Sequence, residues 1–239
     1  MFFILPLLPF LAIYILAAVL PAVILLRYIY RTDTVEKEPP GLLVLLLLMG
    51  VVSALSSGIL EGLGETLLNA LVDPGSPAYT ILLAFLVVAL VEEGTKFILL
   101  KKCTWYHPAF NYRFDAIVYA VFVSLGFAAF ENIQYVLNYG LSVALPRALL
   151  AVPGHMSFAV FMGLFYGRAK LCEAYSYRRG MKRNLLTGYL VAVFLHGFYD
   201  TCAMIGSAVS TMVFLVFVGI MYFWVFRLLK RESSNDMPV

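Results

Sequence analysis

Charged side chains are scarce in this chain. Only 13% of its 239 residues are Asp, Glu, Lys or Arg, whereas 62% are hydrophobic. A soluble domain of this size would have about 25% charged residues. Apolar runs of about 20 residues recur from end to end, which is typical of membrane-spanning helices. The short alternating segments of a β-barrel are missing, so we predict an all-α, polytopic membrane bundle.

Cysteines, basic patches and common protease motifs are also few or missing. Cys103, Cys172 and Cys202 form no C-x-x-C pair and show no metal-ligand spacing, which argues against a disulfide framework. The net charge of +3 comes from the loops, and no basic patch with interleaved aromatics indicates DNA or RNA as a partner. Without H-E-x-x-H there is no zincin helix, and without G-x-S-x-G there is no serine elbow.

Seven apolar segments can be traced along what we treat as a single membrane domain, residues 1–239. The first span covers 2–30, a core bundle with the polar motifs covers 41–229, and a cytoplasmic tail covers 230–239. The six spans predicted in the core bundle are approximately 41–60, 79–100, 114–138, 146–166, 185–205 and 209–229.

Loop charge predicts the orientation. The loops at 27–40, 101–113, 168–183 and 227–231 hold 3, 3, 6 and 3 Lys/Arg, whereas the alternate loops hold one, Arg147. Cytoplasmic loops carry the excess of Lys and Arg in membrane proteins. We therefore predict an N-terminus outside the cell and a C-terminus in the cytoplasm.

A cluster of charges lies inside the third span. Glu92, Glu93 and Lys96 fall within five residues, between the uncharged stretches Tyr79–Leu90 and Phe97–Leu100. A charge near the bilayer centre costs roughly 2.5–3.5 kcal/mol on insertion scales, so this cluster needs partners. In a helix Glu92 and Lys96 share a face, which predicts a supporting ion pair.

Polar residues also lie deep within three later spans. At about 1.5 Å of rise per residue, they fall between the midplane and the outer surface, and the charge cluster falls a little below the midplane. These depths predict one shared cavity open to the outside. These residues are Glu131 and Asn132 in the fourth span, His155 in the fifth, and His196 and Asp200 in the sixth.

Two histidines and several carboxylates in an apolar bundle are typical of a metal site. Zinc binds imidazole and carboxylate, and a catalytic site keeps one position for water. His155 and His196 are the natural ligands, with Glu131 or Asp200 as the third. Asp200, four residues from His196, could instead orient its imidazole. We expect one divalent metal ion at this site, and this set of ligands favours zinc.

Hydrolysis of a peptide bond also needs a general base and an electrophilic donor. Glu92 or Glu93 is the candidate base, or a further ligand. Asn132 is either a hydrogen-bond donor to a developing oxyanion or a residue that hydrogen-bonds between helices.

Two local features carry further expectations. Pro153 and Gly154 are expected to open the helix beside His155, as broken helices do where they line a cavity. Glu61 and Glu65 are expected to lie on a solvated interfacial face at the end of the second span.

Four motifs follow one another on successive spans: Glu92-Glu93-x-x-Lys96, Phe127-Ala-x-x-Glu131-Asn132, His155 and His196-x-x-x-Asp200. In this order they resemble the PrsW-type intramembrane proteases, from about Gly41 to the end of the seventh span. The resemblance to CAAX-processing and bacteriocin-processing membrane proteases is more distant.

The resemblance implies a protease of the bacterial cytoplasmic membrane, surrounded by lipid, that cuts a single-span anti-sigma factor on its outer side. This would be the first cut of regulated intramembrane proteolysis. The resemblance leaves the metal open, because the family is classed as metalloproteases whereas the distant relatives suggest that glutamate and histidine activate water without metal.

Two other functions use the same residues. Intramembrane Glu and His chains also form proton relays, so a proton- or ion-coupled transporter is the alternative, although no internal repeat is evident. A non-catalytic sensor or scaffold is the third hypothesis.

Overall fold

The computed structural model describes residues 7–239, which are mainly helical. Residues 2–6 of the first predicted span lie outside the described residues. The long helices are α1 (Leu7–Thr32), α2 (Pro40–Leu71), α4 (Leu90–Thr104), α5 (Asp115–Tyr139), α7 (Ala151–Ala174), α8 (Arg178–Ile205) and α9 (Ala208–Ser234). The short elements are α3 (Pro77–Leu82), the π-helix η1 (Leu83–Ala89), the 3-10 helix η2 (Leu141–Val143) and α6 (Ala144–Leu149).

Within residues 7–239, six helical stretches are long and apolar enough to cross a membrane. Five of them are the helices α1, α2, α5, α8 and α9, and the sixth is the stretch Leu141–Ala174, which comprises η2, α6 and α7. The predicted all-α membrane bundle is thereby confirmed. The other predicted span, 79–100, is helical throughout but is divided among α3, η1 and α4, and it contains the charged cluster.

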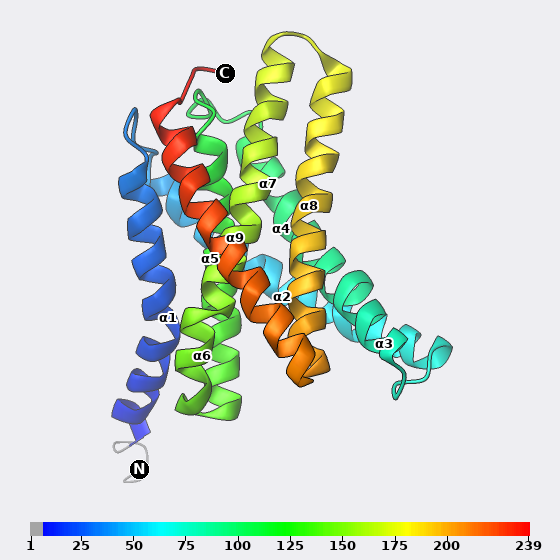
Figure 1. The fold of residues 1–239 in the computed structure, drawn as a ribbon. Coiled ribbons are helices and arrows are strands. Elements are labelled where there is room, and N and C mark those ends of the chain that lie inside the picture. Colours follow the sequence, from blue (N-terminus) through cyan, green and yellow to red (C-terminus); the bar gives the residue numbers. More distant parts are fainter. Residues whose placement is uncertain (1–6) are drawn as a thin grey trace.

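The connections between helices gather at two ends of the bundle (Figure 1). The α1–α2, α4–α5 and α7–α8 connections lie at one end with the C-terminus. The α2–α3, α5–α6 and α8–α9 connections lie at the other end, with the start of α1. The four Lys/Arg-rich segments therefore share one end, as seven passes require, and loop charge predicts that this end is cytoplasmic.

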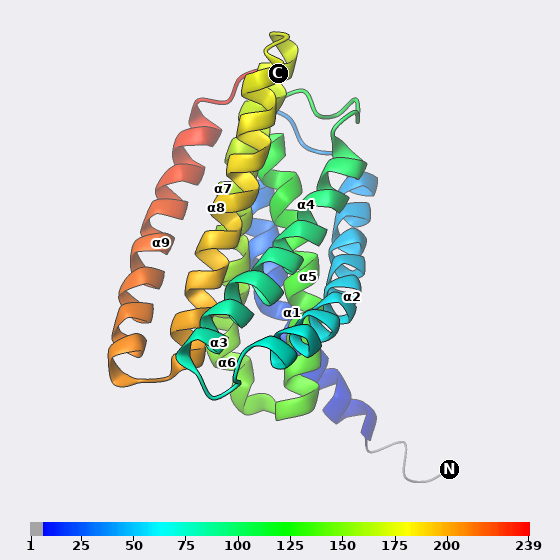
Figure 2. The same cartoon turned by 90° about the vertical axis from the view of Figure 1, so that its right-hand side faces the viewer.

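Helix α5 runs through the middle of the bundle, with α1, α2 and α7 packed around it (Figure 2). Its residues from Asp115 to Ala128 are all buried, as expected for a helix covered on every side. The α2 and α5 backbones touch at two glycines: a Cβ added at Gly50 would lie 2.9 Å from the Gly126 Cα. Small residues allow such close approach of membrane helices.

One predicted boundary is extended and one is wrong. α2 continues as a helix past residue 60, through Glu61 and Glu65, and ends only at Leu71. α7 is not broken at Pro153–Gly154: it begins at Ala151 and runs through both residues. The break lies at Leu150, where φ is −119° and ψ is −61°. Proline is tolerated in the first turn of a helix, because the N–H that it lacks would have no partner there.

The C-terminal residues pack against the α4–α5 connection. α9 continues to Ser234, so the predicted tail consists of a last helical turn and a short docked segment. Val239 N–H donates to the Asn111 carbonyl at 2.9 Å, and Arg113 N–H donates to the Met237 carbonyl at 3.0 Å.

Candidate active site

Three charged side chains of α4 meet inside the bundle. Glu92, Glu93 and Lys96 expose only 5%, 0% and 2% of their surface. Lys96 Nζ lies 3.0 Å from Glu92 Oε2 and 2.8 Å from Glu93 Oε1. The predicted ion pair is therefore present, and Glu93 joins it. The π-helix η1 directly precedes this turn, and π-helical turns are frequent at functional sites.

Helix α8 brings His196 to the same carboxylates. Its Nδ1 lies 3.0 Å from Glu93 Oε1, and its Nε2 lies 3.2 Å from Asp200 Oδ2. Gly197 makes this approach possible, because a Cβ there would lie 2.5 Å from the Phe85 ring of η1. Asp200 thus orients the imidazole from the next turn of its own helix, which is one of the two roles considered for it.

Helix α7 places His155 between an ammonium and a carboxylate. Its Nδ1 lies 3.2 Å from Lys96 Nζ, and its Nε2 lies 3.0 Å from Glu131 Oε2. This pairing favours a proton on Nε2 and a lone pair on Nδ1, which faces the α4 cluster. The His155 and His196 rings are 5.3 Å apart between centroids.

Arg147 of α6 ties Glu131 and Asn132 together. Its Nη2 lies 2.9 Å from Glu131 Oε2, and its Nε donates to Asn132 Oδ1 at 2.7 Å. Asn132 Nδ2 in turn donates to the Ala18 carbonyl of α1 at 2.7 Å. Both ends of the Asn132 amide are engaged in these contacts, so in this structure it is not directed at a substrate carbonyl.

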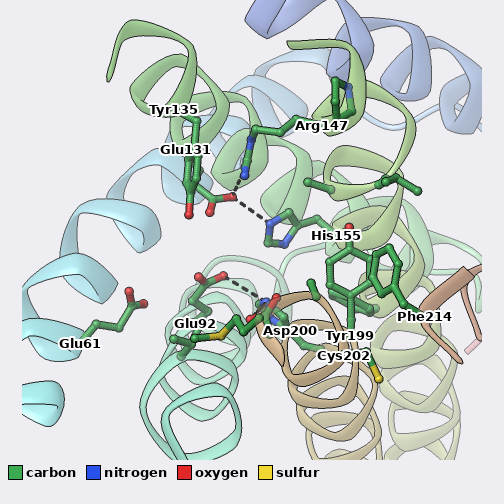
Figure 3. Close-up of a pocket in the computed structure, with 18 of the residues that line it drawn as sticks. Glu61, Glu92, Glu131, Tyr135, Arg147, His155, Tyr199, Asp200, Cys202 and Phe214 are labelled. Carbon is green, nitrogen blue, oxygen red and sulfur yellow. Dashed lines mark hydrogen bonds and ion pairs between the residues drawn. The ribbon is translucent and has the colours of Figure 1, made fainter. Parts of the chain in front are cut away.

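A cavity of about 650 Å³ opens beside these groups (Figure 3). Its lining residues come from the later parts of α5 and α8 and the early parts of α7 and α9, so it lies in the half of the bundle toward the α5–α6 and α8–α9 connections. Glu93 and Lys96 lie directly behind its wall, bonded to residues that face it. The polar residues that line it are Glu61, Glu92, Glu131, Tyr135, Arg147, His155, His196, Tyr199, Asp200 and Thr211.

Apart from Asn132, every predicted site residue thus lies at or directly behind one cavity. The structure also adds two residues. Glu61, expected on a solvated face at the end of the second span, lines the cavity instead. α2 continues about 15 Å beyond it at 1.5 Å per residue, so Glu61 lies within the helix and not at its end. Arg147 stood out in the sequence only as the one basic residue of the alternate loops.

Four of these side chains fit a metal ion by donor type. Ligand atoms of Glu92, Glu93, His155 and His196 all lie within 4.8 Å of one another, and zinc accepts both imidazole and carboxylate. Glu93 Oε2 is buried and accepts no hydrogen bond from residues 7–239, so a cation would satisfy it. Lys96 already contacts three of the four, so a metal ion would compete with its ammonium.

The fold and the site define a class of protein: a multi-pass helical membrane protein with a buried carboxylate–histidine centre beside a cavity, as in a membrane-embedded hydrolase. Sequence comparison identifies the family. Residues 38–227 match the PrsW family of intramembrane metalloproteases. The chain belongs to this family, and it is therefore a membrane-embedded peptidase of a bacterial membrane that acts on a protein substrate.

Named relatives cover most of the chain. It is 38% identical to Protease PrsW of Geobacillus kaustophilus over 184 residues, which are 77% of this chain and 76% of the relative. It is 30% identical to Protease PrsW of Bacillus subtilis over 221 residues, which are 92% and 95% of the two chains. No solved structure matches the chain. The family assignment favours the predicted peptidase over the transporter and the sensor.

Proposed function

We propose that this protein hydrolyses a peptide bond of a single-span membrane protein, an anti-sigma factor, as the first cut of regulated intramembrane proteolysis. The observation that carries the proposal is the buried Glu/His group beside a cavity of about 650 Å³ in a chain of the PrsW family. The cavity lies away from the Lys/Arg-rich end, and by the positive-inside rule this supports a cut toward the outer face.

We assign the role of general base to Glu92, because it lines the cavity whereas Glu93 lies behind it. Glu92 takes a proton from the water that attacks the scissile carbonyl and delivers it to the leaving amine. Lys96, 3.0 Å from Glu92 Oε2, holds this carboxylate toward the cavity. Asn132 acts indirectly in this scheme: it holds Arg147 against Glu131.

His155, His196 and Glu93 would hold a divalent metal ion, which leaves Glu92 free as the base. The ion would supply Lewis-acid chemistry, activating water and polarising the scissile carbonyl. Glu131 and Asp200 keep the two imidazoles oriented through contacts of 3.0 and 3.2 Å. Carboxylates that orient metal-binding histidines typically contribute about 10–100-fold to affinity or activity.

The test uses purified protein in proteoliposomes with a fluorescent single-span reporter. Glu92→Gln and His196→Ala should each lower the cleavage rate by at least about 100-fold. Glu65→Gln, which changes an exposed carboxylate one turn beyond the cavity, is the matched control and should cleave like wild type. Intact cleavage by both Glu92→Gln and His196→Ala would refute the proposal.

Metal content is measured on the same preparations, purified without chelators. We expect about one zinc ion per wild-type chain, lost in His155→Ala and His196→Ala. A wild-type protein that cleaves the reporter without any bound metal would refute the metal site and assign water activation to Glu92 without it.

A further inference from the structure

One carboxylate of the cavity has no ion-pair or hydrogen-bond partner in the described part of the chain. Glu61 projects from α2 into the cavity, across the open space from His155 (Figure 3). Its Oε1 is buried and accepts no hydrogen bond from residues 7–239. The other carboxylates of the site are paired: Glu92 and Glu93 with Lys96, Glu131 with Arg147, and Asp200 with His196.

The charges of the site do not balance. These five carboxylates face two fixed cations, Lys96 and Arg147. With all five carboxylates ionised, a divalent metal ion, or a proton on each of the two histidines, would still leave one negative charge. An uncompensated carboxylate is costly in a medium of low dielectric constant, and a cationic partner relieves that cost. The carboxylate without a protein partner is Glu61, on the α2 wall of the cavity.

The surface of α2 beside Glu61 is open. Gly58 and Gly62 flank it on the helix, and a Cβ added at either position would meet no atom within 4 Å. A substrate chain can therefore approach Glu61 without displacing the described part of the protein. Lys and Arg side chains combine a long apolar stem with a charged head, so they can reach such a carboxylate from a membrane-embedded segment.

We propose that Glu61 binds a Lys or Arg side chain of the substrate close to the scissile bond, and so selects substrates with a basic residue there. The inference rests on the proposed function, because it takes the cavity as the place where the substrate is cut. A peptide in this cavity lies between Glu61 on one wall and the base Glu92 on the other (Figure 3).

The test uses single-span reporter peptides in proteoliposomes, identical except at one position. Mass spectrometry first locates the bond that wild type cleaves, and each position near that bond is then changed to Lys, Gln or Glu. At one position at least, wild type should prefer the Lys probe to the Gln probe by about tenfold in kcat/KM, as for a charge-assisted hydrogen bond in a buried site. Glu61→Gln should abolish that ratio, and Glu61→Arg should prefer the Glu probe.

Two comparisons separate recognition from folding and from chemistry. Glu65→Gln lies on the same helix but on an exposed site, and it should keep the wild-type ratio. Binding is measured separately in the inactive Glu92→Gln background, where the Lys probe should bind about tenfold more tightly than the Gln probe only while Glu61 is present.

The outcomes are distinct. Wild-type cleavage without a preference for Lys at any position would refute this inference and leave the proposed function intact. An equal loss on all probes in Glu61→Gln would also refute it, since Glu61 would then serve the fold or contact the peptide backbone. Cleavage of no reporter by wild type would refute the proposed function and this inference with it.

Discussion

Replacing Lys96 by methionine removes the ammonium that two buried carboxylates share. Lys96 Nζ is 3.0 Å from Glu92 and 2.8 Å from Glu93, and Lys96 exposes only 2% of its surface. Removing one partner of a buried ion pair typically costs about 3–5 kcal/mol, because the other charge remains buried. At about 2–4 °C per kcal/mol for a chain of this length, Lys96→Met should lower the melting temperature by about 6–20 °C.

The assay is thermal unfolding in mild detergent, followed by intrinsic fluorescence after treatment with a chelator. Lys102→Met is the matched control, because Lys102 is an exposed lysine near the end of the same helix. A surface substitution of this kind changes stability by about 0.5 kcal/mol or less. Adding Glu92→Gln to Lys96→Met should restore part of the loss, since one uncompensated charge is removed.

Equal melting temperatures for Lys96→Met and Lys102→Met would refute this account of Lys96. So would a double variant, Lys96→Met with Glu92→Gln, that is less stable than Lys96→Met alone. Either result would mean that the two carboxylates do not depend on Lys96 as their counter-charge.

Two further predictions concern the fold. Gly50→Ala should destabilise the protein by about 1–3 kcal/mol, because its Cβ would collide with the α5 backbone. Gly58→Ala should stabilise the protein by up to about 1 kcal/mol, because a Cβ added there meets no atom within 4 Å. Equal melting temperatures for Gly50→Ala and Gly58→Ala would contradict both predictions. Burial, with nearby carboxylates, raises the pKa of Asp33 from 3.8 to about 6, against the opposing effect of Lys37. The contribution of Asp33 to stability should therefore be lost as the pH rises from 4 through 6, and the melting temperature of Asp33→Asn relative to wild type should rise over that range. A pH-independent difference would refute this.

The membrane architecture could be predicted because hydropathy acts locally. Each apolar run of sufficient length forms its own backbone hydrogen bonds, so the spans follow from the chain alone. The helix boundaries were less predictable. The sequence does not show whether Pro153 breaks a helix or starts one. In the structure the α6–α7 break lies at Leu150, so Pro153 belongs to the first turn of α7.

The candidate residues were also visible, because ionisable side chains stand out in apolar runs. Their partners were not visible. Glu93 and His196 are 103 residues apart, and Lys96 and His155 are 59 residues apart, so only the packing of α4, α7 and α8 brings them into contact. Asn132 shows the limit: the sequence allowed either an oxyanion donor or an interhelical hydrogen bond, and the packing of α1 and α6 engages its amide between helices.

The sequence by itself determined that this chain is a membrane bundle and that Glu92, Glu93, Glu131, His155 and His196 lie within its spans, because the cost of placing charge in lipid depends on each segment alone. The tertiary structure alone decided how those side chains pair, which of them face the cavity, and that Glu61 is among the latter. Close approach at Gly197 brings α8 against η1, and this packing places His196 within 3.0 Å of Glu93.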